Sequence, residues 1–258
     1  MKFSIITCTF NSEKFLLDNI NSVKIQGFLD YEHIFIDGFS SDKTMQIIEN
    51  YKNENPESVK IFQLSPRGIS NAMNEGIKRA TGDYIIHLHA DDFFVDNSVL
   101  RDVNCFLSKY NYDWIYGKIN VINADTGLLG IFPAKKIYQN INSKFASFLL
   151  KFYNYIPHQS VFIKKAVFEH FGGFDEGLTS AMDPDLWLRI AGFTKWSFFD
   201  RLISNLRVHS LSQSSGLSFR IENQKNWRFV QQRYLNKLEL IVASVINFLV
   251  KFKNKTYS

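Results

Sequence analysis

The stretch GDYIIHLHADDFFVD, residues 82–96, decides how the rest of the chain is interpreted. Gly82 interrupts a helix-like pattern, and the apolar run over residues 84–88 has the composition of a buried strand. Two adjacent acids, Asp91 and Asp92, follow this strand directly. Ligands of open α/β sheets collect beyond the carboxyl ends of the strands. Because paired carboxylates there are costly unless neutralised, the sequence predicts a hard, oxygen-seeking divalent ion at this point.

Strand and helix patterns alternate from the start of the chain to this stretch. Short apolar, β-branched runs predict strands over residues 3–9, 31–36 and 59–64. Helical spacing predicts a helix capped by Asn11 or Ser12 with Glu13 in its first turn, another opened by Ser41 and Asp42, and a third over 69–80. The alternation predicts a doubly wound, mostly parallel α/β sheet over roughly the first 100 residues.

The second half of the chain has a less regular pattern. Residues 114–122 and 128–132 flank a turn and predict a β-hairpin. Residues 144–155 predict a helix that presents Phe145, Phe148, Leu149 and Phe152 on one face. The remaining expectations are a helix capped by Asp96 or Asn97 and ending near Tyr110, a strand over 160–164, a short helix from Ala166, a helix over 183–191 and two short strands within 196–208.

Composition bounds the class of protein. The 258 residues are 45% hydrophobic and 21% charged, which is typical of a folded chain. Aromatic residues reach 16%, which suits sugar stacking, a membrane interface or simply a Phe-rich core. A net charge of +5 suits anionic partners such as nucleotides or acidic lipid headgroups. Basic runs interleaved with aromatics are missing, so nucleic acid is not an expected partner. Two cysteines offer no disulfide framework, and the N-terminus does not read as a signal peptide, so the cytoplasm is the expected compartment.

The tail from Leu235 carries apolar residues at three- and four-residue steps. Its uncharged centre, residues 240–250, is too short to span ~30 Å of hydrocarbon. Lys251, Lys253 and Lys255 follow. Three interpretations remain open: a terminal helix packed on the domain, a helix lying in the plane of an anionic membrane surface, or a dimerisation element.

Five stretches in order resemble the inverting family 2 glycosyltransferases with the GT-A fold. They are SIITCTFNSEKFLLDNINSV (4–23), IFIDGFSSDKT (34–44), RGISNAMNEGIKRATGDYIIHLHADD (67–92), GGFDE (172–176) and AMDPDLWLRIAG (181–192). The resemblance covers about residues 1–210. It implies a catalytic domain over 1–212, with a nucleotide-sugar half (1–97) and an acceptor half (98–212), followed by a helical extension over 213–258. It also implies bacterial surface-polysaccharide synthesis of the O-antigen, capsule or exopolysaccharide type.

The resemblance implies an Mg²⁺ or Mn²⁺ ion that stabilises the leaving diphosphate. In the family a D-x-D sequence ends the fourth strand, and here His89-Ala90-Asp91 takes its place. Asp91 then corresponds to the metal ligand, while His89 and Asp92 are expected near the substrate. Arg207 and His209 resemble an R-x-H that reaches the diphosphate or the metal. The alternative is that Asp91 and Asp92 only cap the following loop.

A base must take the proton of the acceptor hydroxyl, and the resemblance places it at Asp183. A helix N-terminus favours the ionised carboxyl there. Met182 stands where the family frequently has Glu, and Asp185 is the competing acid. An N-cap role is the alternative for Asp183. His158, followed by Gln159, is expected on the acceptor side.

Donor recognition is expected in the loops after the first strands. The resemblance places Thr9, Phe10 and Asn11 at the base and Asp37 at uracil N3–H. Where the family usually has D-D-G-S, this chain has Asp37-Gly38-Phe39-Ser40, so the second acid is missing. Arg67 and Gly68 are expected near the base or diphosphate, with Asn74 facing the same site and Asn71 where relatives often carry Asp. Turn and capping roles are the alternative for each.

The sequence therefore predicts an inverting, metal-dependent hexosyl- or N-acetylhexosaminyltransferase. Its donor would be a UDP-sugar and its acceptor a lipid-linked saccharide, at the inner face of the cytoplasmic membrane. Two other classes stay open. The loss of the second acid after Asp37 and of the first acid of D-x-D, at His89, favours a catalytically silent nucleotide- or sugar-binding module. His87, His89 and Asp91 on alternate positions could instead bind zinc in a hydrolase.

Overall fold

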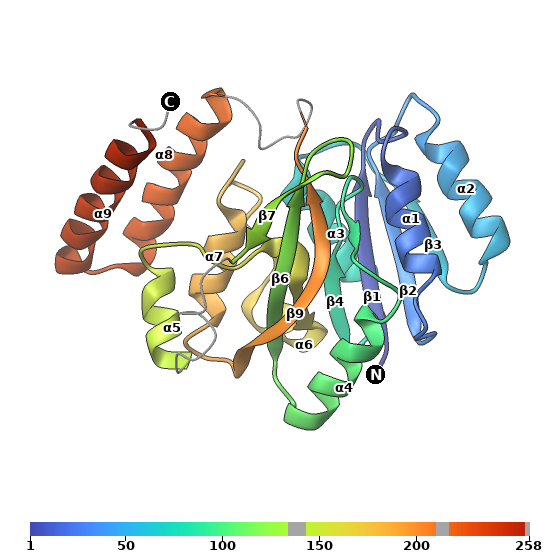
Figure 1. The fold of residues 1–258 in the computed structure, drawn as a ribbon, viewed down its shortest axis with the longest axis horizontal. Helices are drawn as coiled ribbons and strands as arrows, with labels where there is room; N and C mark the ends of the chain where they lie inside the picture. Colours follow the sequence, from blue (N-terminus) through green and yellow to red (C-terminus); the bar gives the residue numbers. More distant parts are fainter. Residues whose placement is uncertain (134–142, 210–216, 256–258) are drawn as a thin grey trace.

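A mixed β-sheet forms the centre of the molecule (Figure 1). The computed structural model describes residues 1–133, 143–209 and 217–255, and within them the sheet has nine strands. Their order is β3-β2-β1-β4-β8-β6-β9-β5, and β7 pairs with β6 outside this path. The strands are β1 Phe3–Thr9, β2 Tyr31–Asp37, β3 Val59–Gln63, β4 Tyr84–His87, β5 Phe93–Phe94, β6 Trp114–Ile122, β7 Leu128–Phe132, β8 Val161–Lys164 and β9 Trp196–Arg207.

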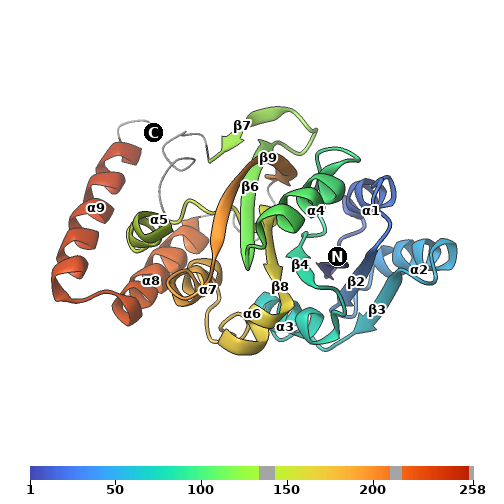
Figure 2. The same ribbon diagram turned by 90° about the horizontal axis from the view of Figure 1, so that it is seen from below.

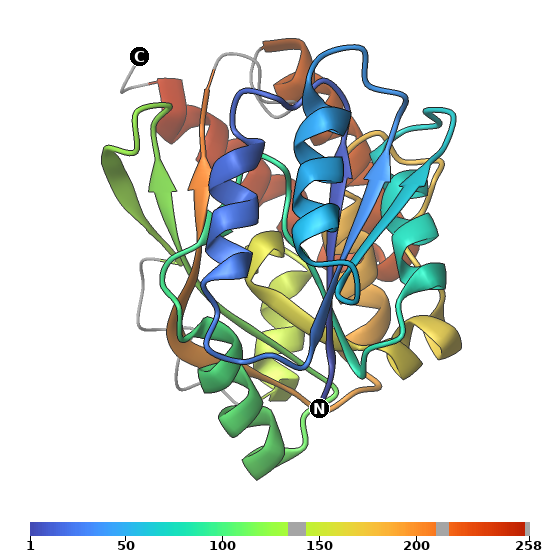
Figure 3. The ribbon, with the colours of Figure 1, turned by 90° about the vertical axis from the view of Figure 1, so that its right-hand side faces the viewer.

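The sheet is continuous, but it has a parallel part and a part with mixed strand directions. Strands β1 to β4 are parallel, whereas β8 is antiparallel to both of its neighbours, β4 and β6. Strand β9 is parallel to β6, and the short β5 is antiparallel to β9. The carboxyl ends of β1, β2 and β3 therefore meet at one edge, the upper edge in Figure 3, as expected for a doubly wound α/β fold.

Helices cover both faces of the sheet (Figure 2). On one face α1, α2 and α4 pack against side chains such as Phe3, Ile5 and Phe35. On the other, α3, α6 and α7 pack against Ile6 and Ile34. Successive strand residues point to opposite faces, so continuous apolar runs supply both cores. The helices are α1 Leu16–Lys24, α2 Thr44–Glu54, α3 Ile69–Arg79, α4 Val99–Tyr110, α5 Ser143–Leu150, α6 Lys165–Phe171, α7 Met182–Ile190, α8 Leu217–Tyr234 and α9 Lys237–Lys255, with a 3₁₀ turn, η2, at His158–Ser160.

The last two helices, α8 and α9, lie beyond α7 at one end of the molecule (Figure 1). Val230 of α8 is completely buried and belongs to the same core as α7. Helix α9 packs through Ala243, which clusters with Phe152 and Leu235. Among the described residues, none of the helices combines the length and the apolar character that crossing a membrane requires.

Most predicted elements are confirmed within one residue, including β1 to β4 and the hairpin of β6 and β7. Four expectations were wrong. The helix over 144–155 ends at Leu150, and the two strands within 196–208 are one strand, because β6 pairs with it along its whole length across irregular register steps. Helix α1 starts at Leu16 without a side-chain cap, because Asn11 Oδ1 accepts from Ser41 N–H and Ser12 Oγ accepts from Phe10 N–H instead. Helix α4 starts after Ser98, whose backbone N–H donates to Asp96.

Candidate functional site

The loops predicted to bind the donor are joined through the carboxyl end of β2. Asp37 is completely buried, and its carboxylate accepts hydrogen bonds from Thr9 Oγ1 (2.9 Å), Ser40 N–H (3.0 Å) and Gln63 Nε2 (3.2 Å). Ser40 Oγ donates a fourth bond at 2.5 Å. With these partners Asp37 fixes the ends of β1, β2 and β3 relative to one another. A contact between Asp37 and a base would replace one of these bonds, and it stays a prediction.

Asn11 and Phe10 form the outer part of the same region. Asn11 has a positive φ of 50°, and its Oδ1 accepts from Ser41 N–H at 2.9 Å. Phe10 is 60% exposed, so its ring is available to a ligand. Arg67 is exposed as well, and Gly68 begins α3 with a φ of 95° that suits glycine. Thus the structure brings the predicted donor residues of β1, β2 and the start of α3 to one edge of the sheet.

Two stacked imidazole rings occupy the region after β4. The rings of His89 and His158 lie 5.1 Å apart with an interplanar angle of 15°. His158, in η2, is almost fully buried, and its Nδ1 lies 3.1 Å from Oδ1 of Asp183 in the first turn of α7. Three predicted site residues from three separate stretches of sequence are therefore in one group.

The charges of both predicted key acids act on this group. Burial and the neighbouring His158 lower the pKa of His89 to about 4, against the opposing effect of Asp91 and Asp183. Burial acts to raise the pKa of Asp183, but His158 and His89 outweigh it and hold that pKa below its ordinary value. Asp183 is therefore ionised at neutral pH, as a proton acceptor must be.

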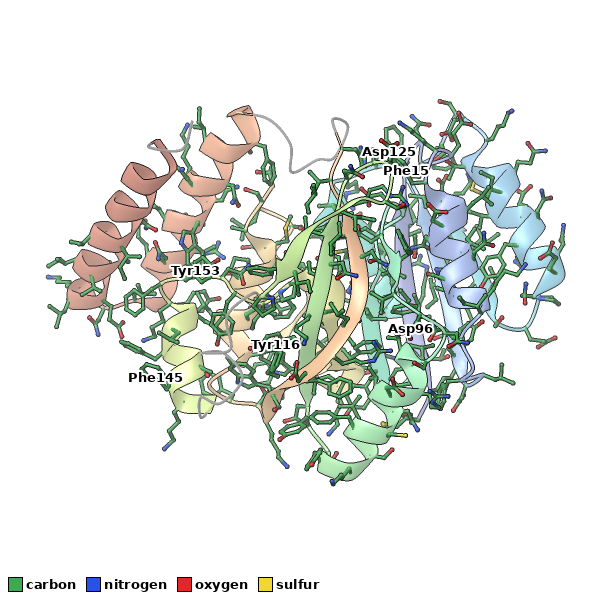
Figure 4. All side chains as sticks on the ribbon, in the orientation of Figure 1. Phe15, Asp96, Tyr116, Asp125, Phe145 and Tyr153 are labelled. Carbon is green, nitrogen blue, oxygen red and sulfur yellow. The ribbon has the colours of Figure 1, made fainter. Side chains whose placement is uncertain are left out.

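Asp91 is paired with the other predicted metal ligand. Its Oδ2 lies 3.0 Å from Nε2 of His209, and the Asp91 side chain is 30% exposed. The His209 ring packs on Phe15, with ring centroids 4.7 Å apart. In the view of Figure 4, Phe15 is labelled at the upper end of the sheet. The predicted Asp91–His209 pair is thus assembled in space from residues 118 positions apart.

Arg207 is buried next to the Asp91–His209 pair and does not face solvent. Its side chain is 3% exposed, and it binds the backbone oxygens of Asp91 (3.3 Å) and Ala124 (2.8 Å) as well as the Asp18 carboxylate. The guanidinium also lies over the rings of Phe15 and Phe93. The predicted contact of Arg207 with the diphosphate would require these partners to be released. The structure instead gives Arg207 a position that fixes the Asp91 loop.

Asp92 and Asn74 likewise have internal partners. Asp92 is 1% exposed, and its Oδ1 accepts from Arg207 N–H at 2.9 Å. Burial and the charge of Asp91 raise the pKa of Asp92 well above its ordinary value. Asn74 binds Phe174 through both ends of its amide and Glu176 through Nδ2, and so supports the GGFDE loop. Substrate contacts of these two residues would cost these bonds and stay predictions.

The donor set after β4 fits a hard cation only in part. Among the residues that the structure describes, no three His, Cys, Asp or Glu side chains are placed to hold a metal ion together. Asp91 and His209 supply two donors, and Mg²⁺ commonly takes its other ligands from phosphates and water. The structure disfavours the zinc site predicted from His87, His89 and Asp91, because His87 is buried with Nε2 3.5 Å from the Met73 carbonyl oxygen. His87 is therefore a core residue and not a ligand beside His89 and Asp91.

Sequence reasoning missed two residues of α1 that support the site. Asn19 is completely buried, and its Nδ2 donates to the backbone oxygens of His89 (2.9 Å) and Asp92 (3.0 Å). Asp18 pairs with Arg207. The signal was a buried asparagine at a helix position between Leu16 and Val23, where an apolar residue would be expected.

The known proteins that this chain resembles in sequence are glycosyltransferases. A family model described as "Glycosyl transferase family 2" matches residues 4–171. Poly(ribitol-phosphate) beta-N-acetylglucosaminyltransferase TarS of Staphylococcus aureus is 30% identical over 126 residues, which are 48% of this chain but only 22% of TarS. The PGL/p-HBAD biosynthesis glycosyltransferase Rv2957 of Mycobacterium tuberculosis is 26% identical over 204 residues, 79% of this chain and 70% of that protein.

Solved structures show the same fold. TarS 1–349 of S. aureus in complex with UDP-GlcNAc has a TM-score of 0.70 at 20% identity, with 95% of this chain and 70% of that chain covered. The mannosyltransferase PcManGT from Pyrobaculum calidifontis, in complex with GDP-Man and Mn²⁺, has a TM-score of 0.66 at 14% identity, with 95% and 73% covered. These likenesses confirm the predicted GT-A arrangement of the sheet.

Proposed function

The chain belongs to glycosyl transferase family 2, and from this membership we propose that it is an inverting transferase. The proposed donor is a UDP-linked hexose or N-acetylhexosamine. TarS, which is similar in sequence and fold, is named as an N-acetylglucosaminyltransferase and binds UDP-GlcNAc. The proposed acceptor is a hydroxyl of a lipid-linked saccharide in bacterial surface-glycan synthesis, O-antigen, capsule and exopolysaccharide included. Residues 1–97 would serve the donor, 98–212 the acceptor, and 213–258 would form the extension.

One observation carries the proposal: Asp183 lies 3.1 Å from His158, which stacks on His89, and the charges of both Asp183 and Asp91 raise the pKa of His89 against the effect of its burial. The two acids come from separate motifs, 92 positions apart, and His89 senses the charge of both. Inverting transfer needs two opposed functions, a base for the acceptor and charge stabilisation for the leaving diphosphate. This arrangement supports assigning the first to Asp183 and the second to the Asp91 side.

The proposed reaction uses Asp183 as the base. The acceptor oxygen bonds to the anomeric carbon, its proton passes to the Asp183 carboxylate, and the bond to the diphosphate breaks with its electrons on the diphosphate. The lowered pKa of Asp183 keeps it ready for this proton at neutral pH. An Mg²⁺ or Mn²⁺ ion, held by Asp91 and His209, would neutralise the charge that develops on the leaving group. Asp37 and Thr9 would fix the loops that bind the nucleobase of the donor, with Phe10 exposed beside them.

The test is release of nucleoside diphosphate from a panel of nucleotide-sugars, with Mn²⁺ and lipid-linked acceptors. Asp183→Asn should lower turnover by about 10²–10⁴-fold, because the acceptor would lose its base. Asp30→Asn is the matched control, since Asp30 is 59% exposed and precedes β2 at the other end of the strands. A catalytically silent binding module would instead bind UDP without releasing diphosphate from any donor. Turnover that Asp183→Asn leaves unchanged would contradict the assignment of the base.

We propose further that one end of the molecule lies on the anionic inner face of the cytoplasmic membrane. Helix α9 exposes Leu238 (71%), Ile241 (62%), Val242 (42%) and Val245 (53%), which are spaced along one helical stripe. Phe145 and Phe148 of α5 are also exposed, and Figure 4 shows Phe145 at the outer surface of α5. The acid near this stripe, Glu239, is paired with Lys151, and Lys251, Lys253 and Lys255 follow the stripe in the sequence. Apolar exposure with a basic flank suits an anionic lipid surface.

A further inference from the structure

Helix α8 contacts the segment that carries Asp183 at two separated points. Near its middle, Asn226 Nδ2 donates to Thr179 Oγ1 and to Ser180 Oγ, both at 3.0 Å. Glu222 accepts a hydrogen bond from the same Thr179 hydroxyl at 2.5 Å. At its end, Arg233 Nη1 and Tyr234 OH donate to Asp185 Oδ1, at 3.0 and 3.1 Å. Asp183 lies between these two sets of contacts.

Asp185 is the centre of the second contact. It is 1% exposed, so its carboxylate needs internal partners. Besides Arg233 and Tyr234 it accepts from Arg189 Nη2 at 2.7 Å. Arg233 also binds Asp175 Oδ2 at 2.6 Å, and Arg189 binds the backbone oxygens of Phe171 and Gly173 at 2.9 Å. One charge network therefore joins α8, α7 and the GGFDE loop.

The backbone between the two contacts is strained. Ala181, directly before α7, has a φ of 60°, a left-handed conformation that costs free energy for a residue with a Cβ. Such a conformation persists where the surrounding structure enforces it. Asn226 binds the two residues before Ala181, and Arg233 binds the helix after it. Helix α8 thus enforces the turn that directs Asp183 towards His158.

We propose that Arg233 and Asn226 are positioning residues, which hold the turn and the first turn of α7 so that Asp183 stays beside His158. This inference rests on the proposed function of Asp183 as base. It makes α8 part of the catalytic unit and not of a separable extension. The shared core supports this, because Val230 of α8 is buried in the cluster that contains Leu186 and Trp187 of α7.

The test compares Arg233→Gln and Asn226→Ala with Arg228→Gln, an exposed control on the same helix. We expect each of the first two variants to lower kcat by roughly tenfold or more, since small misplacements of a catalytic group can cost up to about 10²-fold. The donor KM should hardly change, because Thr9 and Asp37 lie on other elements. Arg233→Lys, which keeps the charge, should recover part of the loss. Asn226→Ala serves as the decisive variant if Arg233→Gln lowers the melting temperature strongly.

Two further measurements separate this inference from the proposed function. Amide hydrogen exchange over residues 178–190 should become faster in both variants and not in Arg228→Gln, whether or not a donor is known. In an Asp183→Asn background, Arg233→Gln should cause no further loss of residual turnover, because both act through the same base. Unchanged kcat or unchanged exchange in Asn226→Ala would overturn the positioning role. Full activity of Asp183→Asn would instead contradict the assignment of Asp183 as the base. The exchange measurement would still show whether α8 holds residues 178–190 in place.

Discussion

Gly173 and Asn74 approach each other too closely for any other residue at position 173. A Cβ on Gly173 would lie 2.1 Å from Asn74 Oδ1 and 2.9 Å from its Cγ. Asn74 cannot move without losing its bonds to Phe174 and Glu176. Gly173→Ala should therefore lower the free energy of unfolding by about 1–3 kcal/mol, measured by urea denaturation.

Gly192→Ala is the control for this prediction, because a Cβ there would meet nothing within 4 Å. Combining Gly173→Ala with Asn74→Ala should cost less than the sum of the two single changes, since the second removes the atoms that collide. Additive costs would show that Asn74 is not what excludes a side chain from position 173.

The sequence predicted which residues belong to the site better than it predicted the buried contacts that surround them. Asp91, His209, His158 and Asp183 were all expected at the site, and the structure brings them together in two adjacent pairs. Their motifs fix a place along a strand or helix, so their position follows from local pattern. The buried environments of Arg207 and Asp92 depend on contacts between α1, β9 and the turn after β4. Such contacts between distant segments leave no local signal.

Elements with a strong apolar pattern were predictable, and short or irregular ones were not. Strands β1 and β2 are buried on both faces, and their β-branched runs mark their ends within a residue. Strand β5 has two residues, which is too short for any periodicity to register. Strand β9 contains Asp200 and Arg201 at positions that suggest a break, but pairing with β6 continues beyond them. Pairing with a neighbour therefore overrides the local pattern.

Strand β2 carries a titratable group into the middle of the sheet and makes the fold sensitive to acid. Burial lowers the pKa of His33 from 6.5 to about 3, and its Nε2 lies 2.9 Å from Thr7 Oγ1. Between these pH values the unfolded chain binds a proton that the folded chain excludes. The stability that His33 contributes is thus fully present above pH 6.5 and is lost as the pH falls towards about 3.

We expect His33→Gln to flatten the dependence of the unfolding free energy on pH over this interval, as measured by urea denaturation at successive pH values. Some dependence should remain, because burial also lowers the pKa of His87 and His89. His170→Gln, at an exposed position of α6, is the control. An unaltered slope in His33→Gln would rule out His33 as a source of the acid sensitivity.

For the whole molecule, the arrangement of α5 and α9 predicts where it meets lipid. Ile241→Glu combined with Val245→Glu should reduce co-sedimentation with vesicles that contain anionic lipid, because a charge replaces apolar surface that would be buried. Added salt should weaken the binding of the unaltered protein, since its net charge is +5. Leu29→Glu, at a position 85% exposed between α1 and β2, controls for loss of apolar surface elsewhere. Equal sedimentation of all three proteins would contradict this orientation.

The pairing of β4 with β8 has a mechanical consequence. Tyr84 opposes Lys164 and Ile85 opposes Ile163, so hydrogen bonds between strands join the proposed nucleotide half to the proposed acceptor half. Two domains joined by a flexible linker can move apart by a hinge motion, but one continuous sheet resists such a motion. For the proposed transfer, we expect entry of the donor and release of the diphosphate to depend on movement of the connecting loops and not of the sheet.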